Sequence, residues 1–307
     1  MFKNRFRSLW VGGLLVTTLV SGVALVPVRA DVPPSIAVID TGTNPALFKD
    51  SLVAEACFLE YSLCPNGKRS MEGAGAAALP TARINATMSH GTQMLSIIHK
   101  VAPTAKLVMV RIVGLTDLGN PYIYSLDAVK QGLDWVIANR VKYNIAVVSI
   151  SQGKVFDNCK VPAGMAAQVA TLKAVQVPVI SATGNNGNRS AIFSPACLPD
   201  VVSVGATDNP WGGMESYAWD PAATPYIARY SNGSPDTDFY ANGRWFVTNV
   251  DGTTKFMVGT SNATASISGL WLVNRKPSFD ATYAGIAATS TVAKNEWLTG
   301  RYVFINS

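Results

Sequence analysis

The chain has 307 residues, of which 48% are hydrophobic and 14% are charged, and its formal net charge is +6. This is the composition of a folded globular protein and it excludes a disordered chain. The positive charge is neither large nor gathered into one stretch, so we expect no nucleic-acid partner.

The first thirty residues have the pattern of a secretory signal peptide. Three basic residues precede an apolar run from Leu9 to Val26, and Val28-Arg29-Ala30 places small residues where a signal peptidase cuts. An uncleaved anchor is the alternative, because the run just reaches the length of a membrane span. Residues 1–30 hold four basic and no acidic residues, so their removal leaves 21 Lys and Arg against 19 Asp and Glu. We expect residues 31–307 to be a single domain that is secreted or periplasmic, with no further membrane segment.

The first element of this domain is expected to deliver a carboxylate to the edge of a sheet. Ser35 to Ile39 is an apolar run that ends at Asp40-Thr41-Gly42, which is typical of a buried parallel strand. Open α/β sheets carry their chemistry at the carboxyl ends of such strands. The segment from Lys49 to Met88 is rich in turns and has no clear period, so no element is assigned there. Apolar residues at helical spacing then predict a helix from Ser89 to His99, with His90 at its start.

Strands and helices alternate through the middle of the chain. The pattern predicts strands at Lys106 to Val113, Ile145 to Ile150, Val177 to Ala182 and Val201 to Val204, and helices at Tyr122 to Val141 and Ala163 to Gln176. This alternation indicates an α/β fold with a doubly wound, mostly parallel sheet and helices on both faces. The segment from Trp211 to Lys255 is rich in Gly, Pro, Asn and aromatic residues, so we expect loops and a small region of antiparallel hairpins in this C-terminal part.

A strand-like run then breaks at Gly259 and restarts as a helix of small residues, with Ser261 in its first turn. A serine there receives the positive end of the helix dipole, and its backbone N–H has no partner within the helix. These are properties of an acyl-transfer nucleophile that carries its own oxyanion donor. A second helix is expected at Asp280 to Ala288 and a last strand at Arg301 to Ile305.

The four cysteines are an even number, which in an exported chain favours two disulfides over a metal site. The spacing of Cys57 and Cys64 fits the closure of a small loop. The others are Cys159 and Cys197, and four cysteines allow three pairings. Zinc would require Cys and His close together, and both histidines lie far from every cysteine in the sequence, so we expect no metal ligands.

Asp40, His90 and Ser261 could each be an ordinary cap or turn residue. Together they follow the chain order Asp, His, Ser of the subtilisin triad. The segments around them resemble the corresponding signatures of the subtilisin-like serine peptidases, and further segments match in type and order: Val38-Ile39-Asp40-Thr41-Gly42, Ser89-His90-Gly91-Thr92, Val147-Val148-Ser149-Ile150-Ser151-Gln152-Gly153, Ser181-Ala182-Thr183-Gly184-Asn185, Ser194-Pro195-Ala196, Val201-Val202-Ser203-Val204-Gly205-Ala206 and Gly259-Thr260-Ser261-Asn262-Ala263. The resemblance extends over roughly residues 35 to 290.

This resemblance implies a subtilisin-like fold and a serine endopeptidase that acts on a protein or peptide substrate. It makes Ser261 the nucleophile, His90 the general base and then acid, and Asp40 the carboxylate that orients the imidazole. Asn185 would donate its side-chain amide to the oxyanion, beside the Ser261 backbone N–H. It also implies a set of substrate-binding residues around the first specificity pocket: Ser151, Gln152, Gly153, Thr183, Gly184 and Phe193.

The resemblance also has implications for the disulfide pairing, for cofactors and for partners. It favours a Cys159–Cys197 disulfide, which leaves Cys57–Cys64 as the second. The chemistry requires no cofactor, and no calcium ligands of the family can be matched to residues of the 49–88 segment. Asp40 follows the expected cleavage site by ten residues, which leaves no room for the folded prodomain of secreted relatives. We therefore expect the domain either to fold unaided or to use a separate folding partner or inhibitor.

Two other classes of protein share part of this sequence pattern. Asp40-Thr41-Gly42 also matches an aspartic peptidase signature, but that chemistry needs two carboxylates that share a proton, and the chain has no second Asp-Thr-Gly or Asp-Ser-Gly. The other alternative is a binding protein on a catalytically decayed subtilase scaffold. Ala265-Ser266, which departs from the family pattern after the nucleophile, favours that alternative, and the presence of all three triad residues and Asn185 opposes it.

Overall fold

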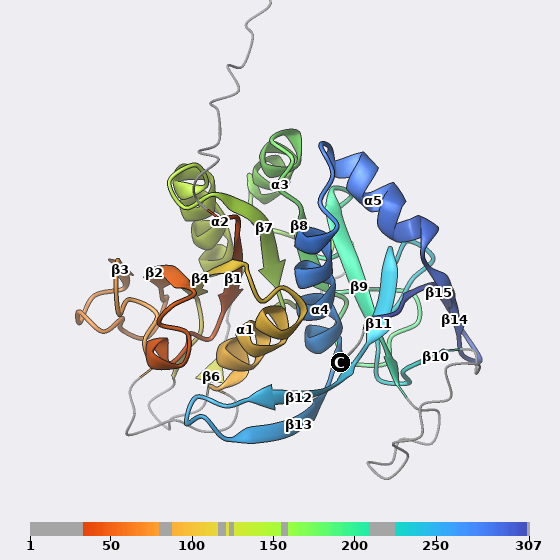
Figure 1. The fold of residues 1–307 in the computed structure, drawn as a ribbon, viewed down its shortest axis with the longest axis horizontal. Helices are drawn as coiled ribbons and strands as arrows, with labels where there is room; N and C mark the ends of the chain where they lie inside the picture. The colour runs from red at the N-terminus through yellow and green to blue at the C-terminus, as the bar shows by residue number, and fades with distance from the viewer. Residues whose placement is uncertain are drawn as a thin grey trace, which may run out of the picture.

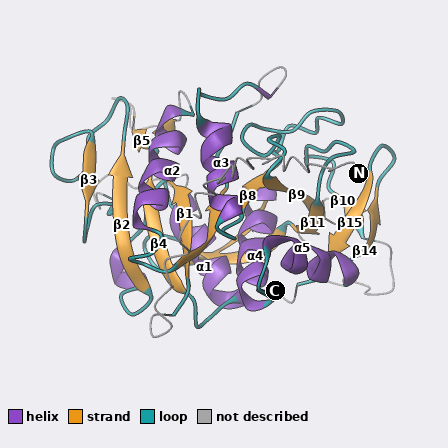
Figure 2. Cartoon of the chain, turned by 90° about the horizontal axis from the view of Figure 1, so that it is seen from above, coloured by secondary structure: helices purple, strands orange, loops and turns teal. Residues whose placement is uncertain are grey.

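The computed structural model describes residues 33–79, 88–115, 121–122, 126–154, 159–208 and 225–305, so the expected signal peptide lies outside the described residues. Within them, an eleven-stranded sheet forms the centre of the molecule and helices cover both of its faces (Figures 1 and 2). None of the helices in this part of the chain has the length and apolarity needed to cross a membrane.

Most of the sheet is parallel, as the alternation of apolar runs and helices predicted. The parallel strands are, in spatial order, β15 (Thr299–Val303), β11 (Phe239–Asn242), β9 (Val201–Asp208), β8 (Val179–Ala182), β7 (Ile145–Ile150), β1 (Ser35–Asp40), β4 (Lys106–Arg111) and β2 (Leu52–Phe58). The edges are antiparallel pairs: β3 (Ser70–Glu72) on β2, β14 (Thr291–Lys294) on β15, and β10 (Tyr226–Ile227), which pairs with β9 and runs parallel to β14.

Apolar residues of the sheet are buried against helices on both sides, which is why the strands read as continuous hydrophobic runs. One core lies between the sheet and α1 (His90–Val101), α4 (Thr260–Val273) and α5 (Phe279–Ala288). The other lies between the sheet and α2 (Asp127–Asn139) and α3 (Met165–Ala174). In Figure 2 these two groups of helices lie on opposite sides of the strands. The doubly wound α/β architecture is therefore confirmed.

The expected antiparallel hairpin is also present. β12 (Arg244–Thr248) and β13 (Thr254–Val258) form a separate two-stranded sheet, as do the short β5 (Gly114–Leu115) and β6 (Pro121–Tyr122). The β12–β13 hairpin lies beside α1 (Figure 1), and Gln93 of α1 donates from Nε2 to Asn249 Oδ1 in its turn at 2.8 Å. Gln93 thus anchors the helix that begins with His90 to the hairpin.

The segment from Lys49 to Met88, for which no element is predicted, contains the two strands β2 and β3, and the short 3-10 helix η1 (Pro45–Leu47) lies just before it. Glu55 interrupts the apolar pattern of β2, although its side chain is buried and accepts hydrogen bonds from the backbone N–H groups of Gly75 and Ala77. A buried carboxylate satisfied by a distant loop gives no signal in a local window. Residues 80–87 of this segment lie outside the described residues.

Three further differences concern the C-terminal half and α2. The segment expected to hold only loops and antiparallel hairpins also contributes β11, which is parallel to β9 and β15, and part of that segment, residues 209–224, lies outside the described residues. β14 was not predicted. The helix expected from Tyr122 begins at Asp127. β11 and β14 are only four residues long, and so short a run gives too few positions for a periodic pattern to indicate a strand.

Candidate active site

Asp40 is the last residue of β1, in the middle of the sheet, between β4 and β7. It is fully buried, and its Oδ1 accepts a hydrogen bond of 2.7 Å from the backbone N–H of Thr41. A buried carboxylate is stable as an anion only when it is paired and hydrogen-bonded. The carboxyl end of β1 therefore presents a fixed negative charge at the position predicted from the strand pattern.

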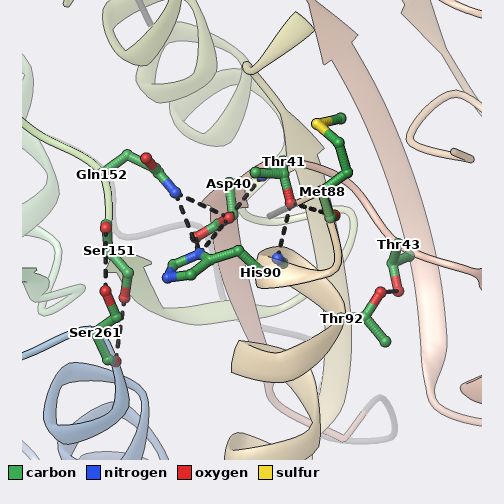
Figure 3. Close-up of polar contacts among 10 residues, drawn as sticks. Asp40, Thr41, Thr43, Met88, His90, Thr92, Ser151, Gln152 and Ser261 are labelled. Atoms are coloured by element: carbon green, nitrogen blue, oxygen red, sulfur yellow. Dashed lines mark hydrogen bonds and ion pairs between the residues drawn. The ribbon is translucent and has the colours of Figure 1, made fainter. Parts of the chain in front are cut away.

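His90 supplies the partner of this charge. Its Nδ1 lies 2.8 Å from Oδ1 and 2.9 Å from Oδ2 of Asp40 (Figure 3). A hydrogen on Nδ1 donates to the carboxylate, and the lone pair of the ring is then on Nε2. Burial opposes protonation of His90, but the charge of Asp40 and its hydrogen bond prevail, so the pKa of His90 is raised above its ordinary value.

The start of α1 is held against β1 by the residue after Asp40. Thr41 donates from Oγ1 to the carbonyl oxygen of Met88 at 2.9 Å, and the same Oγ1 accepts from the backbone N–H of Gly91 at 2.8 Å. A Cβ at Gly91 would lie 2.3 Å from the carbonyl oxygen of Gly42, so only glycine allows this approach. These contacts explain why Thr and Gly accompany the Asp and His in the two motifs.

Ser261 is the second residue of α4 and is buried, with 6% of its surface exposed. In Figure 3 the imidazole of His90 lies between Asp40 and Ser261, with its second ring nitrogen on the side of Ser261. Among the described residues, the partner of the Ser261 hydroxyl is the carbonyl oxygen of Ser151 at 3.5 Å rather than His90. Catalytic hydrogen bonds are commonly long or misaligned before substrate binds, and a small rotation of the serine side chain changes its partner.

Asn185 lies on the exposed loop after β8 and is tied to the start of α4. Its Oδ1 accepts from both the backbone N–H and the hydroxyl of Thr260, each at 2.9 Å. Because the amide oxygen is occupied in this way, the orientation of the side chain is fixed and the Nδ2 group is available as a donor beside Ser261. The sequence indicated Asn185 but gave no sign that Thr260 orients it.

Asn232, the first residue of the formal glycosylation sequon Asn232-Gly233-Ser234, braces the same loop. Its side chain is fully buried, its Nδ2 donates to the carbonyl oxygen of Thr183 at 3.0 Å, and its Oδ1 accepts from the backbone N–H groups of Asn186 and Asn188 at 3.0 and 2.9 Å. These bonds cross the loop on both sides of Asn185. A pattern of Asn followed by Gly and Ser is common, so no sequence signal distinguishes this role.

The residues expected to bind substrate come from three segments that lie together. Lys154 and Ser194 exchange backbone hydrogen bonds of 3.2 and 2.9 Å, and Phe193 donates its backbone N–H to the carbonyl oxygen of Thr183 at 2.9 Å. The half-buried Phe193 ring lies between two glycines: a Cβ at Gly184 would be 2.5 Å from the ring, and one at Gly153 would be 3.3 Å from it. Phe193 therefore fills the space between the two expected pocket walls. Gln152 differs from this group, because its side chain is directed to Asp40 and His90 (Figure 3).

Both expected disulfides are present: Cys57–Cys64 and Cys159–Cys197. The second joins the segment after β7 to the turn that follows Phe193, so it connects two sides of the expected pocket. In the described part of the chain, no group of three or more His, Cys, Asp or Glu side chains is arranged to hold a metal ion.

Known proteins share this sequence pattern and fold. The profile of the subtilase family matches residues 33–287. An extracellular serine proteinase of Thermus sp. (strain Rt41A) is 29% identical over 230 residues, which cover 69% of this chain and 48% of that protein. An alkaline serine exoprotease A of Vibrio alginolyticus is 28% identical over 192 residues, or 59% of this chain and 30% of that protein. The chain thus spans about half or less of the length of these relatives.

Solved structures agree with the fold. A cold adapted subtilisin-like serine proteinase superposes with a TM-score of 0.59 and 20% identity over 90% of both chains. A psychrophilic protease superposes with a TM-score of 0.63 and 19% identity over 87% of both chains. At this identity the likeness establishes the subtilisin-like fold that the sequence predicted.

Proposed function

The chain belongs to the subtilase family of peptidases, and we propose that it is an exported serine endopeptidase that hydrolyses peptide bonds through Asp40, His90 and Ser261. The observation that carries the proposal is the pair of contacts between His90 Nδ1 and both oxygens of Asp40, on the side of the sheet where Ser261 lies in the first turn of α4.

The first half of the proposed reaction forms an acyl-enzyme. Ser261 Oγ attacks the carbonyl carbon of the peptide bond while His90 Nε2 accepts its proton, and Asp40 stabilises the imidazolium. His90 then gives this proton to the leaving amine as the carbon–nitrogen bond breaks. In the second half a water attacks the ester, His90 takes a proton from it, and the proton returns to Ser261 as the carboxylate product leaves.

The negative charge that develops on the carbonyl oxygen needs fixed donors. The Nδ2 group of Asn185 and the backbone N–H of Ser261 are proposed to supply them. Support comes from the bonds that hold Asn185 Oδ1 to Thr260, since they orient the amide before substrate arrives. A preoriented donor costs no reorganisation during the reaction.

The position of Phe193 bears on the substrate. If the space between Gly153 and Gly184 receives the residue before the cut, the phenyl ring already occupies part of it. Exclusion by shape changes preference by roughly 1–3 kcal/mol per methylene-sized difference. We therefore propose a bias toward small residues at that position of a protein or peptide substrate.

Export and cofactors complete the proposal. The signal-like residues 1–30 support secretion or transfer to the periplasm, and mass measurement of the exported protein would show a new N-terminus at Asp31. Apart from the substrate and one water, the proposed reaction uses only groups of this chain. Addition of a chelator to the folded protein should therefore leave the chemical step unchanged.

A decayed binding protein is the second candidate, and one observation favours it: the hydroxyl of Ser261 is directed to Ser151 and not to His90. The two functions are separated by incubating the purified protein with an unfolded protein substrate and sequencing the products. An endopeptidase gives internal cleavage that is lost in Ser261→Ala. A binding protein leaves the substrate intact in both cases.

A further inference from the structure

Gln152 contacts both charged members of the proposed catalytic site. It lies two residues after the end of β7 and is half-buried. Its Nε2 donates to Oδ1 of Asp40 at 3.1 Å and lies 3.2 Å from Nδ1 of His90 (Figure 3). The proposed reaction gives no role to this side chain.

The chemistry of the three groups determines which end of the amide faces them. Ionised Asp40 can only accept hydrogen bonds, so the amide nitrogen of Gln152 faces Oδ1 and the amide oxygen points away. Nδ1 of His90 carries a hydrogen when it donates to Asp40. The N–H groups of Gln152 and the N–H of the ring therefore converge on one carboxylate, and they present like partial charges to each other at 3.2 Å.

Two effects on His90 follow, and both make its imidazole harder to protonate. The bond from Gln152 takes up part of the negative charge that Asp40 offers to the imidazolium. The positive end of the amide dipole also lies next to Nδ1 and opposes a positive charge on the ring. Both effects are strong because Asp40 is fully buried, away from the screening of water.

We propose that Gln152 is a positioning residue that sets the proton affinity of His90, by weakening the hold of Asp40 on the imidazolium. This role rests on the proposed function, in which His90 must release its proton at each turnover. An ion pair between Asp40 and His90 that was too stable would leave the base protonated and idle at neutral pH.

Gln152 is well placed for this role because few other groups act on the ring. Among the described residues, Asp40 on β1 is the charged group that faces His90, and it raises the pKa of His90 against the effect of burial. The start of α4 brings Ser261, and the segment after β7 brings Ser151 and Gln152, all of which are uncharged at neutral pH. A change at position 152 therefore acts directly on the Asp40–His90 pair.

The test is a titration of the imidazole by NMR, which does not depend on hydrolysis. The chain has only two histidines, so histidine-selective labelling gives two ring signals, and His99 in the last turn of α1 is an internal reference. The comparison uses Gln152, Gln152→Met and Gln152→Glu, each with Ser261→Ala to prevent self-digestion. Met keeps the length of the side chain without a donor. Glu keeps the shape and adds a negative charge.

The proposal predicts an order for the midpoint of the His90 titration. It should rise by about half a pH unit in Gln152→Met, because one donor to Asp40 is lost. It should rise by about one unit or more in Gln152→Glu, because a second carboxylate then lies beside the ring. The ring signals of His99 should be the same in both variants as in the parent protein.

An unchanged His90 midpoint in Gln152→Met, or a fall, overturns the proposal. So does a comparable change in the ring signals of His99, which would indicate a general change of structure. With Ser261 restored, the acid limb of kcat/KM should move by the same amount as the midpoint, and a change in KM alone would show a substrate-binding role instead. If no variant hydrolyses peptides, the proposed function fails while the NMR titration still decides the role of Gln152.

Discussion

Replacement of Asn232 with alanine tests whether the loop that carries Asn185 needs the hydrogen bonds from the Asn232 side chain to keep its position. The change removes three hydrogen bonds from a fully buried side chain to the backbone of the 183–188 loop. Each is worth about 1 kcal/mol net, and the two released N–H groups are partly exposed and regain water, so we expect a loss of about 2–3 kcal/mol in the free energy of unfolding. For a domain of this size that loss corresponds to a fall in Tm of roughly 5–10 °C.

The same variant should also lose kcat, because Asn185 no longer has a fixed position for the oxyanion. Thermal unfolding and peptide hydrolysis are measured on the same preparations, at a temperature where both proteins are folded. Asn188→Ala is the matched control, since within the part of the chain that the structure describes its side chain bonds to Ser190 and Ala191 of its own turn and to no other segment. If Asn232→Ala loses stability but keeps the kcat of the wild type, the loop does not need this brace and the reasoning is wrong.

The remaining predictions concern the base, the pocket and the second disulfide. His90 must be neutral to accept a proton, and its pKa is raised above the ordinary histidine value of about 6.5. We therefore expect kcat/KM to reach a plateau in the alkaline range and to fall as the pH drops through this raised pKa. A maximum of kcat/KM below pH 5 would indicate an aspartic mechanism instead. Phe193→Gly should widen the space between Gly153 and Gly184 and raise kcat/KM for peptides with Phe or Leu before the cut, whereas an unchanged preference would place Phe193 outside the pocket. Replacing Cys159 and Cys197 with serine opens a link between residues 38 apart in sequence and should lower the free energy of unfolding by about 4 kcal/mol, as measured in urea.

The architecture was largely predictable because parallel strands buried on both faces leave a strong local pattern. β7 was predicted with its bounds, and β1, β4, β8 and β9 were found within a few residues. β2 was missed because Glu55 breaks its apolar run, and the partners that satisfy this carboxylate, Gly75 and Ala77, lie twenty and more residues away. Local patterns cannot anticipate such a partner.

The site residues also divide into those indicated by a local motif and those whose role depends on distant contacts. Asp40, His90, Asn185 and Ser261 were indicated by short motifs at the ends of elements, and Thr41 and Gly91 are explained by the contacts that join those ends. Asn232 and the direction of the Gln152 side chain had no such signal. Both depend on contacts between segments far apart in the sequence, 49 residues for Asn232 with Thr183 and 112 for Gln152 with Asp40.

The buried state of two formal glycosylation sites follows from the structure and not from the sequence. Asn262 is fully buried beside Ser261, and its Nδ2 donates to the carbonyl oxygens of Gly243 and Met257. Asn232 is equally buried. Neither amide is accessible to a glycan in the folded protein, so Asn262 is expected to be unmodified in active enzyme, in agreement with a site that must admit substrate.

Covalent labelling of Ser261 tests the central claim most directly. A fluorophosphonate reacts only with a serine that is activated by a base and placed beside oxyanion donors. The exported protein should take up one label, and peptide mapping should place it on Ser261. His90→Ala should be labelled far more slowly, and Ser261→Ala should not be labelled at all. Failure of the folded wild-type protein to react, or a label on another serine, would contradict the assignment of Asp40, His90 and Ser261 as a catalytic triad.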